Sequence, residues 1–331
     1  MTTGTTTVVA TAPGGPEVLA VRTVPALRPG PGEVVVDVAA AGVNFIDTYR
    51  RSGVYPMTYP GVLGSEGAGT VTAVGDGVET VRPGDRVAWC DAPDSYASQV
   101  LLPAERAVPV PDDVDLLTAA ALPLQGLTAH YLVTSTFAVG PGQDVLVHAG
   151  AGGVGLLLTQ LAVRRGARVI TTVSTSDKAD LSRAAGAHDV VLYTELDDLT
   201  RDLPAVVRGL TDDRGVHVAY DSVGKDTFDA SLASVRTRGT LVLFGGSSGQ
   251  VPPFDLQRLN AAGSLAVARP SLAHHVATRE ELLSRSDDLF RAVSDGTLHV
   301  RVGATYPLAD AARAHEALES RRTTGKVLLV P

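Results

Sequence analysis

Residues 144–155 read Asp-Val-Leu-Val-His-Ala-Gly-Ala-Gly-Gly-Val-Gly, and this stretch is the most informative in the chain. An apolar run leads directly into the pattern G-x-G-x-x-G, and a helical pattern follows from Leu156. This order of strand, glycine-rich turn and helix is the context of a dinucleotide-binding fingerprint, for which a purely structural glycine-rich turn is the alternative. The three glycines of the pattern are Gly150, Gly152 and Gly155.

Each glycine of the pattern has an expected physical role. Gly150 permits a tight turn, Gly152 lets the backbone approach a pyrophosphate, and Gly155 lets the helix pack close to the strand. The N–H groups at the start of the helix and the positive end of its dipole then face the phosphates. The residues expected at the phosphates are therefore Gly150, Gly152, Gly153, Val154 and Gly155.

The sequence around this stretch, from Leu116 to about Ala268, alternates apolar strands with helical patterns. Near-continuous apolar strands separated by helices predict a parallel sheet covered on both faces. This is a doubly wound α/β domain, whose ligand is expected beyond the carboxyl ends of the strands. The predicted strands are 145–148, 168–172, 190–193, 216–221, 240–244 and 264–268, and the main predicted helices are 154–165, 178–185 and 227–235.

The flanking parts of the chain are of a different kind. Before about residue 125, short valine-rich strands alternate with turns such as Pro83-Gly84-Asp85, and no alternation of strands with helices begins before Leu116. After about residue 270 the chain returns to short mixed elements. The predicted early strands are 33–38, 69–74 and 85–89, and the later elements are helices over 280–293 and 308–320 and a strand over 326–330.

The bulk composition argues against several classes of protein. A chain of 331 residues is long enough for two domains, and a formal net charge of −8 without a run of basic residues argues against nucleic-acid binding. Cys90 is the only cysteine, so neither an intrachain disulfide nor a cysteine metal cluster can form. The N-terminus lacks a signal-peptide pattern and no apolar run reaches the roughly 18 residues of a membrane span. We therefore expect a cytoplasmic protein without a membrane partner.

The end of the second strand of the α/β domain indicates which dinucleotide is bound. An NAD-preferring domain places an acid there for the ribose 2′-hydroxyl. Here the strand is followed by the hydroxyl residues Ser174, Thr175 and Ser176, and then by Asp177 and Lys178. A 2′-phosphate needs hydrogen-bond donors and positive charge, and this chain has only three lysines. The segment favours NADPH, against the alternatives that Asp177 binds a 2′-hydroxyl or that Lys178 is a solvated surface residue.

Motifs along the whole chain resemble, in order, those of one enzyme family. They are 42–49 (GVNFIDTY), 52–56 (SGVYP), 63–69 (LGSEGAG), 83–87 (PGDRV), 149–155 (AGAGGVG), 221–224 (DSVG) and 325–329 (GKVLL). The chain thereby resembles the zinc-independent quinone oxidoreductases, the zeta-crystallin-like branch of the medium-chain dehydrogenase/reductase superfamily, and in particular the bacterial NADPH:quinone reductases.

The resemblance implies a fold and an assembly. It implies a GroES-like β-rich catalytic domain formed by residues 1–125 and 270–331, into which a Rossmann NADPH-binding domain of residues 126–269 is inserted. It also implies a substrate cleft between the domains and a homodimer paired through the cofactor domain.

The resemblance also implies that the chain holds no zinc. Zinc-dependent members of the superfamily bind catalytic zinc with a cysteine at the position of Asn44 and a histidine at the position of Ser65. Neither side chain here is a usual zinc ligand. The structural zinc lobe with four cysteines is missing, and the adjacent His274 and His275 lack a ligand-like spacing. We therefore expect metal-free chemistry.

Further site residues are carried over from the resemblance. Tyr193 and, more loosely, Arg321 match contacts of the family to the adenosine phosphate. On the nicotinamide side the matching residues are Asn44, Thr128, Ser222, Gly224, Phe244, Gly245 and Ser247. An ordinary strand-to-loop turn is the alternative for the positions that follow strands.

The resemblance places Asn44, Tyr49 and Tyr55 in the acceptor cleft, and Arg269 beside it. Hydride transfer needs positioning more than protein chemistry, and a donor near the acceptor oxygen stabilises the charge that develops there. A tyrosine hydroxyl would serve as that donor, although both tyrosines could instead be packing residues.

The leading hypothesis is an NADPH-dependent quinone reductase. The alternatives are a reductase of activated alkenes such as enones or enals, or a non-catalytic NADPH-binding protein of the crystallin-like or RNA-binding kind. The acidic charge balance disfavours RNA.

Overall fold

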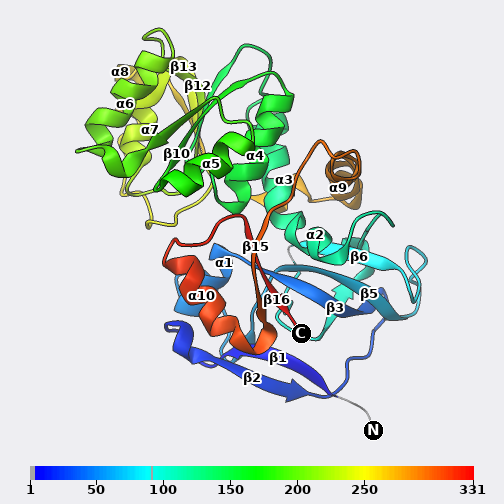
Figure 1. Cartoon of the computed structure of the whole chain (residues 1–331). Coiled ribbons are helices and arrows are strands. Elements are labelled where there is room, and N and C mark those ends of the chain that lie inside the picture. Colours follow the sequence, from blue (N-terminus) through cyan, green and yellow to red (C-terminus); the bar gives the residue numbers. More distant parts are fainter. Residues whose placement is uncertain (1–3, 91) are drawn as a thin grey trace. The chain divides into compact units, whose positions relative to one another are not determined.

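The computed structural model describes residues 4–90 and 92–331, and they form two compact units (Figure 1). Unit 1 comprises residues up to 127 together with 276–331, and unit 2 comprises residues 128–275. The boundaries expected from the sequence, after residues 125 and 269, lie two and six residues earlier than these. The first boundary falls inside helix α3 (Pro123–Tyr131).

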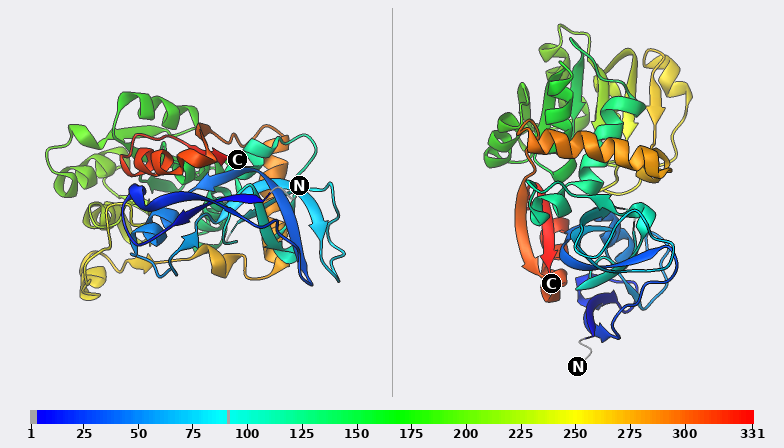
Figure 2. Two further views of the ribbon diagram at one scale, coloured as in Figure 1. Left: turned by 90° about the horizontal axis from the view of Figure 1, so that it is seen from below. Right: turned by 90° about the vertical axis from the view of Figure 1, so that its right-hand side faces the viewer.

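Unit 1 is built on a seven-stranded sheet in the order β15-β16-β3-β5-β6-β8, with β7 also paired to β3. Leu328 of β16 lies opposite Gly42 of β3. The last strand of the chain therefore pairs with a strand from its N-terminal part in one sheet (Figures 1 and 2). A second, three-stranded sheet has the order β2-β1-β4. The strands are β1 (Thr5–Ala10), β2 (Leu19–Val24), β3 (Glu33–Val43), β4 (Gly61–Val62), β5 (Glu66–Val74), β6 (Arg86–Cys90), β7 (Gln99–Pro103), β8 (Val108–Pro109), β15 (Val302–Pro307) and β16 (Lys326–Val330).

The helices of unit 1 include one that the apolar periodicity does not reveal. Helix α1 (Phe45–Ser52) begins after Asn44, whose N–H donates to the Asp47 carboxylate at 2.9 Å, and ends at Gly53 with φ of 82°. Its buried residues are Asp47, Thr48 and Arg51, so its inward face is polar. The other helices are α2 (Leu116–Ala121), α3, α9 (Arg279–Ser294) and α10 (Ala311–Glu319).

Unit 2 is the predicted doubly wound domain. Its six parallel strands have the order β11-β10-β9-β12-β13-β14, so the chain runs outward from β9 first in one direction and then in the other. The strands are β9 (Asp144–Val147), β10 (Arg168–Val173), β11 (Asp189–Leu192), β12 (Val216–Asp221), β13 (Val235–Leu243) and β14 (Ala266–Ala268). The helices are α4 (Gly153–Arg164), α5 (Ser176–Ala184), α6 (Leu199–Leu210), α7 (Phe228–Ser234) and α8 (Gln257–Ala261).

Both faces of this parallel sheet are covered, which explains its continuous apolar strands. On one face, Leu146 and Ile170 belong to a core that includes Leu203 of α6 and other residues of α6 and α7. Side chains of opposite parity point to the other face, where Val173 packs against α5 and the Tyr220 hydroxyl donates to the Leu132 carbonyl at 2.9 Å.

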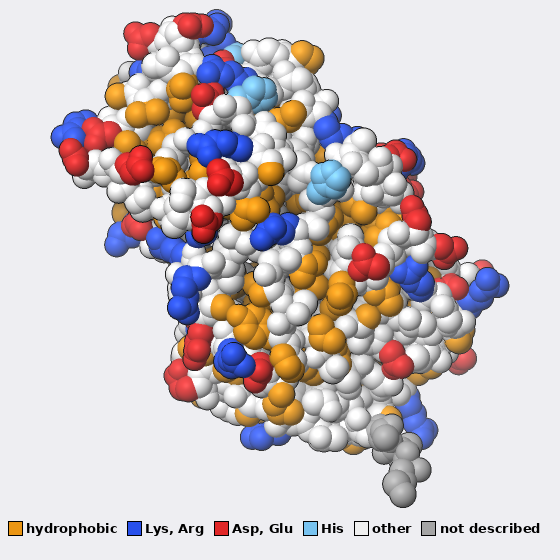
Figure 3. Space-filling view, in the orientation of Figure 1, with side chains coloured by type: hydrophobic (Ala, Val, Ile, Leu, Met, Phe, Trp, Pro, Cys, Tyr) orange, Lys and Arg blue, Asp and Glu red, His pale blue; other side chains and the backbone are white. Residues whose placement is uncertain are grey.

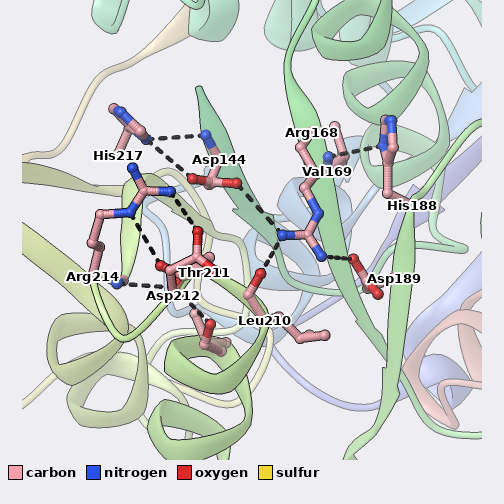
Figure 4. Close-up of polar contacts among 12 residues, drawn as sticks. Asp144, Arg168, Val169, His188, Asp189, Leu210, Thr211, Asp212, Arg214 and His217 are labelled. Atoms are coloured by element: carbon pink, nitrogen blue, oxygen red, sulfur yellow. Dashed lines mark hydrogen bonds and ion pairs between the residues drawn. The ribbon is translucent and has the colours of Figure 1, made fainter. Parts of the chain in front are cut away.

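A polar cluster lies at the amino ends of the strands of unit 2 (Figure 4). Arg168 pairs with Asp189 at 2.8 Å and also donates to the Leu210 carbonyl. The Asp144 N–H donates to Nδ1 of His217 at 3.0 Å, which requires an unprotonated Nδ1. Burial and nearby arginines lower the pKa of His217, in agreement with this neutral form. The cluster therefore lies at the end of the sheet opposite to the expected ligand.

The surface carries charges of both signs. On the face drawn in Figure 3, lysine and arginine side chains alternate with aspartate and glutamate side chains. No helix of the described chain is long and apolar enough to span a membrane.

Candidate active site

The fingerprint turn follows β9, the strand at which the sheet order reverses, and this is where α/β sheets bind their ligands. The left-handed backbone conformation in this turn falls on Ala149, with φ of 54°, and not on Gly150. The role of Gly150 in this turn is therefore not a left-handed backbone conformation. A Cβ there would lie 2.6 Å from Cβ of Thr171 and 2.8 Å from the Ser182 hydroxyl, so Gly150 is needed for space.

The other two glycines of the fingerprint have different surroundings. A Cβ on Gly155 would lie 2.2 Å from the Ala149 carbonyl oxygen, so this glycine lets α4 pack directly on the turn. A Cβ on Gly152 would meet only Ala149 within 4 Å, at 3.2 Å or beyond, so it would project into open space at the start of α4. A pyrophosphate could bind in that space, because the first N–H groups of a helix, here those of Gly153 and Val154, have no acceptor within the helix.

The residues expected at a 2′-phosphate lie together after β10. Nζ of Lys178 donates to the Ser174 hydroxyl at 3.2 Å, and the Thr175 hydroxyl accepts the Lys178 N–H at 3.4 Å as the N-cap of α5. Partial burial lowers the pKa of Lys178. An anion bound beside it would have the opposite effect, because a nearby negative charge favours the charged form of the lysine. Thr194 donates to the Ser174 carbonyl at 2.9 Å, which holds the turn after β11 beside them. Tyr193 begins this turn and is not the last residue of the strand.

The loops after β12 and β13 are joined through Asp221, the last residue of β12. Its buried carboxylate accepts the N–H groups of Val223 and Gly224, at 2.8 and 3.0 Å. The Ser222 carbonyl accepts the Ser247 N–H at 3.2 Å, and a Cβ on Gly245 would lie 2.4 Å from the same oxygen. The expected positions Ser222, Gly224, Phe244, Gly245 and Ser247 thus form one tightly packed pair of loops at the carboxyl ends of the strands.

Two further expected residues of unit 2 lie outside these loops. Thr128 is buried on α3, with 7% of its surface exposed. Arg269 follows β14 and is exposed. Burial raises the pKa of Tyr131 to about 12, and the charge of Arg269 opposes this shift. The Tyr131 ring stacks on His275 with 4.2 Å between centroids.

The aromatic residues of unit 1 form a cluster on α1 and the segment that follows it. The Tyr49 and Tyr55 rings meet edge to face at 5.4 Å, and Phe45 lies 6.3 Å from Tyr49. The Tyr55 N–H donates to the Tyr49 carbonyl at 3.0 Å, which fixes the segment against the helix. Both tyrosines are half-buried. Arg321, also in unit 1, is exposed before β16 with φ of 57°.

The Asn44 side chain belongs to a closed buried network, which we call the lysine cluster (Asn44, Glu66, Gln125 and Lys326). The three donated hydrogens of Lys326 go to Glu66, to Asn44 at 2.8 Å and to Gln125 at 2.9 Å. The Asn44 amide donates to Glu66 at 2.7 Å and to the Gly42 carbonyl at 3.2 Å, while its oxygen also accepts from Gln125. Every donor and acceptor of the Asn44 side chain is therefore used within unit 1.

The resemblance puts Asn44 at the position of a zinc ligand, and the residues of the lysine cluster do not fit zinc. An ammonium group lies against Asn44 and Glu66, and a cation there would repel a second one. Ser65 accepts a hydrogen bond from Arg50 at 2.7 Å and donates to Asp47 at 3.3 Å. Among residues 4–90 and 92–331, no group of three or more His, Cys, Asp or Glu is arranged to hold a metal ion.

A second buried network lies beside the first. The Tyr96 hydroxyl donates to Asp47 at 3.1 Å and lies 3.1 Å from Nε2 of His315, whose Nδ1 lies 3.0 Å from Arg51. Burial raises the pKa of Asp47 to about 6 and lowers the pKa of His315 to about 3. Arg51 is also paired with Glu319 at 2.7 Å.

Sequence reasoning missed the partners of Asn44. The motifs 325–329 and 63–69 include Lys326 and Glu66, but no local pattern gives a role to either of them or to Gln125. One signal for Lys326 exists in the sequence, because it directly precedes the apolar run Val-Leu-Leu-Val of a predicted strand. A rare charged residue at such a position indicates a buried ion pair.

Comparisons with known proteins agree with this fold. Residues 30–139 match the GroES-like domain of alcohol dehydrogenases, and residues 153–285 match the family described as zinc-binding dehydrogenases. These matches define the class as medium-chain dehydrogenases/reductases.

Relatives narrow this class to one family. A quinone oxidoreductase of Pseudomonas aeruginosa is 45% identical over 96% of this chain and 97% of its own length. A 2-haloacrylate reductase of a Burkholderia species is 42% identical over 96% of both chains. The chain belongs to the quinone oxidoreductase family.

Two solved structures share the whole fold. A mycobacterial protein in complex with NADPH has a TM-score of 0.95 and 52% identity, covering 99% of this chain and 100% of that one. The Escherichia coli quinone oxidoreductase, also in complex with NADPH, has a TM-score of 0.95 and 43% identity, covering 98% and 100%.

Proposed function

We propose that this chain is a zinc-independent NADPH:quinone oxidoreductase. The observation that carries the proposal is the lysine cluster, because an ammonium group lies against Asn44, the residue that the resemblance puts at the position of a zinc ligand. Without that metal, direct transfer of a hydride to an electron-poor acceptor is the chemistry that remains. The relatives named as quinone oxidoreductases support the same assignment.

The cofactor would be NADPH, which supplies a hydride from its nicotinamide ring when bound. The pyrophosphate would meet the N–H groups of Gly153 and Val154, over the space beside Gly152. Lys178 and Ser174 would bind the 2′-phosphate. The loops after β12 and β13 would hold the nicotinamide side through Ser222, Phe244, Gly245 and Ser247, with Thr128, Tyr193 and Arg321 as further contacts.

The acceptor would be held by the aromatic cluster of α1, and Arg269 would border it. A quinone oxygen gains negative charge as the hydride arrives, so a nearby hydroxyl donor stabilises the transition state. The Asn44 amide is already committed to the lysine cluster, which makes it a support of this site. We therefore assign the donor role to the hydroxyl of Tyr49 or Tyr55.

A steady-state screen tests the reaction. NADPH oxidation is followed with benzoquinone, a naphthoquinone and 2-cyclohexenone as acceptors. The proposal expects the highest kcat/KM with a quinone. Higher kcat/KM with the enone would favour the activated-alkene reductase, which the likeness to a 2-haloacrylate reductase supports. Tight NADPH binding without turnover on any acceptor would favour the non-catalytic alternative.

We also propose that two copies of the chain pair through β14, the edge strand of unit 2. Ala266 and Val267 are exposed on this strand, and Leu256 beside α8 is 70% exposed. An exposed apolar edge strand offers unpaired backbone groups to a second strand. The cytoplasmic location expected from the sequence remains a prediction.

A further inference from the structure

Lys326 is a buried cation with a complete set of partners. It begins β16, its side chain is 3% exposed, and its partner carboxylate on Glu66 has no exposed surface. The second Glu66 oxygen accepts the Leu124 N–H at 2.8 Å, next to Gln125 at the start of α3. Four elements, namely β16, β5, α3 and the start of α1, therefore meet at one ammonium group.

The charge of Lys326 decides how two amides are oriented. An ammonium group only donates hydrogen bonds, so the amide oxygens of Asn44 and Gln125 must both point toward it. The Asn44 amide nitrogen is then directed at Glu66 and the Gly42 carbonyl, and the Gln125 nitrogen is directed at the Asn44 oxygen. An uncharged residue at position 326 would remove this constraint.

The two amides lie at the starts of two helices that carry proposed site residues. Asn44 is the N-cap of α1, and Tyr49 lies one turn further along that helix. Gln125 lies in the first turn of α3, and Thr128 follows three residues later. Lys326 thus holds the N-cap side chain of α1 and a side chain in the first turn of α3. A change in the cluster would therefore reach the acceptor side and the nicotinamide side together.

We propose that Lys326 is a positioning residue for hydride transfer, whose ammonium group holds the first turns of α1 and α3 in their working places. This inference rests on the proposed function for its kinetic part only. It gives the buried ion pair a role beyond stability, because small displacements of positioned groups cost up to about a hundredfold in rate.

The test uses a charge-neutral pair of substitutions in the full-length protein. Lys326→Met alone leaves Glu66 buried without a counter-charge, which is strongly destabilising and can prevent folding. The double variant Lys326→Met/Glu66→Gln removes both charges and keeps similar volumes. Glu319→Gln is the control, because it removes the half-exposed partner of the buried Arg51 on α1 and leaves all four residues of the lysine cluster unchanged.

Three quantities are compared in the wild type, the single variant Lys326→Met, the double variant and the control. They are Tm, the single-turnover rate of hydride transfer to a quinone, and hydrogen–deuterium exchange in residues 44–48 and 123–128. We expect the double variant to regain most of the Tm lost by Lys326→Met, to transfer hydride at least about tenfold more slowly, and to exchange faster in both segments. The loss of rate should exceed any rise in its Kd for NADPH, because Lys178 and the fingerprint turn lie in unit 2, outside the lysine cluster.

The control should lose Tm without a loss of the hydride-transfer rate. A double variant with wild-type rate and wild-type exchange would overturn the proposal and leave the ion pair a purely structural role. If the wild type reduces no acceptor, the proposed function fails, but the exchange measurement still decides whether Lys326 holds the two first turns.

Discussion

Lys178 is the residue on which the choice of cofactor depends. Its ammonium group lies against the Ser174 hydroxyl after β10. We predict that Lys178→Ala raises the Kd for NADPH by about tenfold or more and leaves the Kd for NADH nearly unchanged, because one charge-assisted hydrogen bond is worth about 1.5–3 kcal/mol. Fluorescence titration with both cofactors measures this. Asp177→Asn is the companion variant. If it weakened the binding of NADH alone, Asp177 would be a contact of the ribose 2′-hydroxyl.

His315 and Asp47 make opposite contributions to the pH dependence of folding. The pKa of His315 falls from 6.5 to about 3 on folding, through burial and Arg51, so between these values only the unfolded chain binds the proton. The contribution of His315 to the free energy of unfolding therefore rises with pH. The pKa of Asp47 rises from 3.8 to about 6 through burial, so between these values only the folded chain holds the proton, and its term falls with pH.

These two contributions should separate in single variants. Between pH 4 and 6, His315→Gln should make the slope of unfolding free energy against pH more negative than in the wild type, and Asp47→Asn should make it more positive, each by about 1.4 kcal/mol per pH unit. Urea unfolding at a series of pH values measures both slopes. Curves of the two variants that run parallel to the wild type would contradict the assigned pKa shifts.

The glycines of the fingerprint determine how closely helix α4 packs on the turn after β9. We predict that Gly155→Ala destabilises the protein by about 1–3 kcal/mol and weakens NADPH binding, because its Cβ would overlap the Ala149 carbonyl. Gly209→Ala in α6 is the matched control. A Cβ there meets nothing within 4 Å, so this change should stabilise by about 0.5–1 kcal/mol. Equal effects of the two substitutions on Tm would contradict the assigned packing.

The elements of unit 2 could be predicted from the sequence because their strands are buried on both faces. The strand expected at 216–221 is β12 (Val216–Asp221), with the same bounds. Strand β13 begins at Val235, five residues before the predicted start, because its first part carries the polar residues Arg236, Thr237 and Arg238, which no apolar pattern marks. Helix α1 was missed for a related reason, since its buried face is polar.

The site could be predicted only where it is local in the sequence. The fingerprint turn and the segment Ser174–Lys178 each lie within a few residues, so strand and helix patterns locate them. The partners of Asn44 come from β5, α3 and β16, and no local pattern shows that they meet. The left-handed conformation of Ala149 could not be predicted either, because in such a motif this conformation is expected at a glycine.

At the scale of the whole molecule, the proposed pairing through β14 is open to test. Val267→Lys should convert the dimer to monomers, because it places a charge on the edge strand where a second copy would pair. Sedimentation velocity measures the change. Val206→Lys on α6, a valine with similar exposure, should leave the assembly intact. A wild-type protein that sediments as a monomer would rule the pairing out.

The order in which the chain is synthesised determines when the lysine cluster can form. Unit 2 is a continuous segment and has all of its strands once residue 275 has been made, whereas unit 1 needs β16 to complete its sheet. Glu66 and Lys326 are separated by 260 positions, so a nascent chain carries the carboxylate long before its counter-charge. Because domains fold as units during synthesis, unit 2 can fold before β16 has been made, whereas unit 1 completes its sheet and the lysine cluster only after residue 326 has been added.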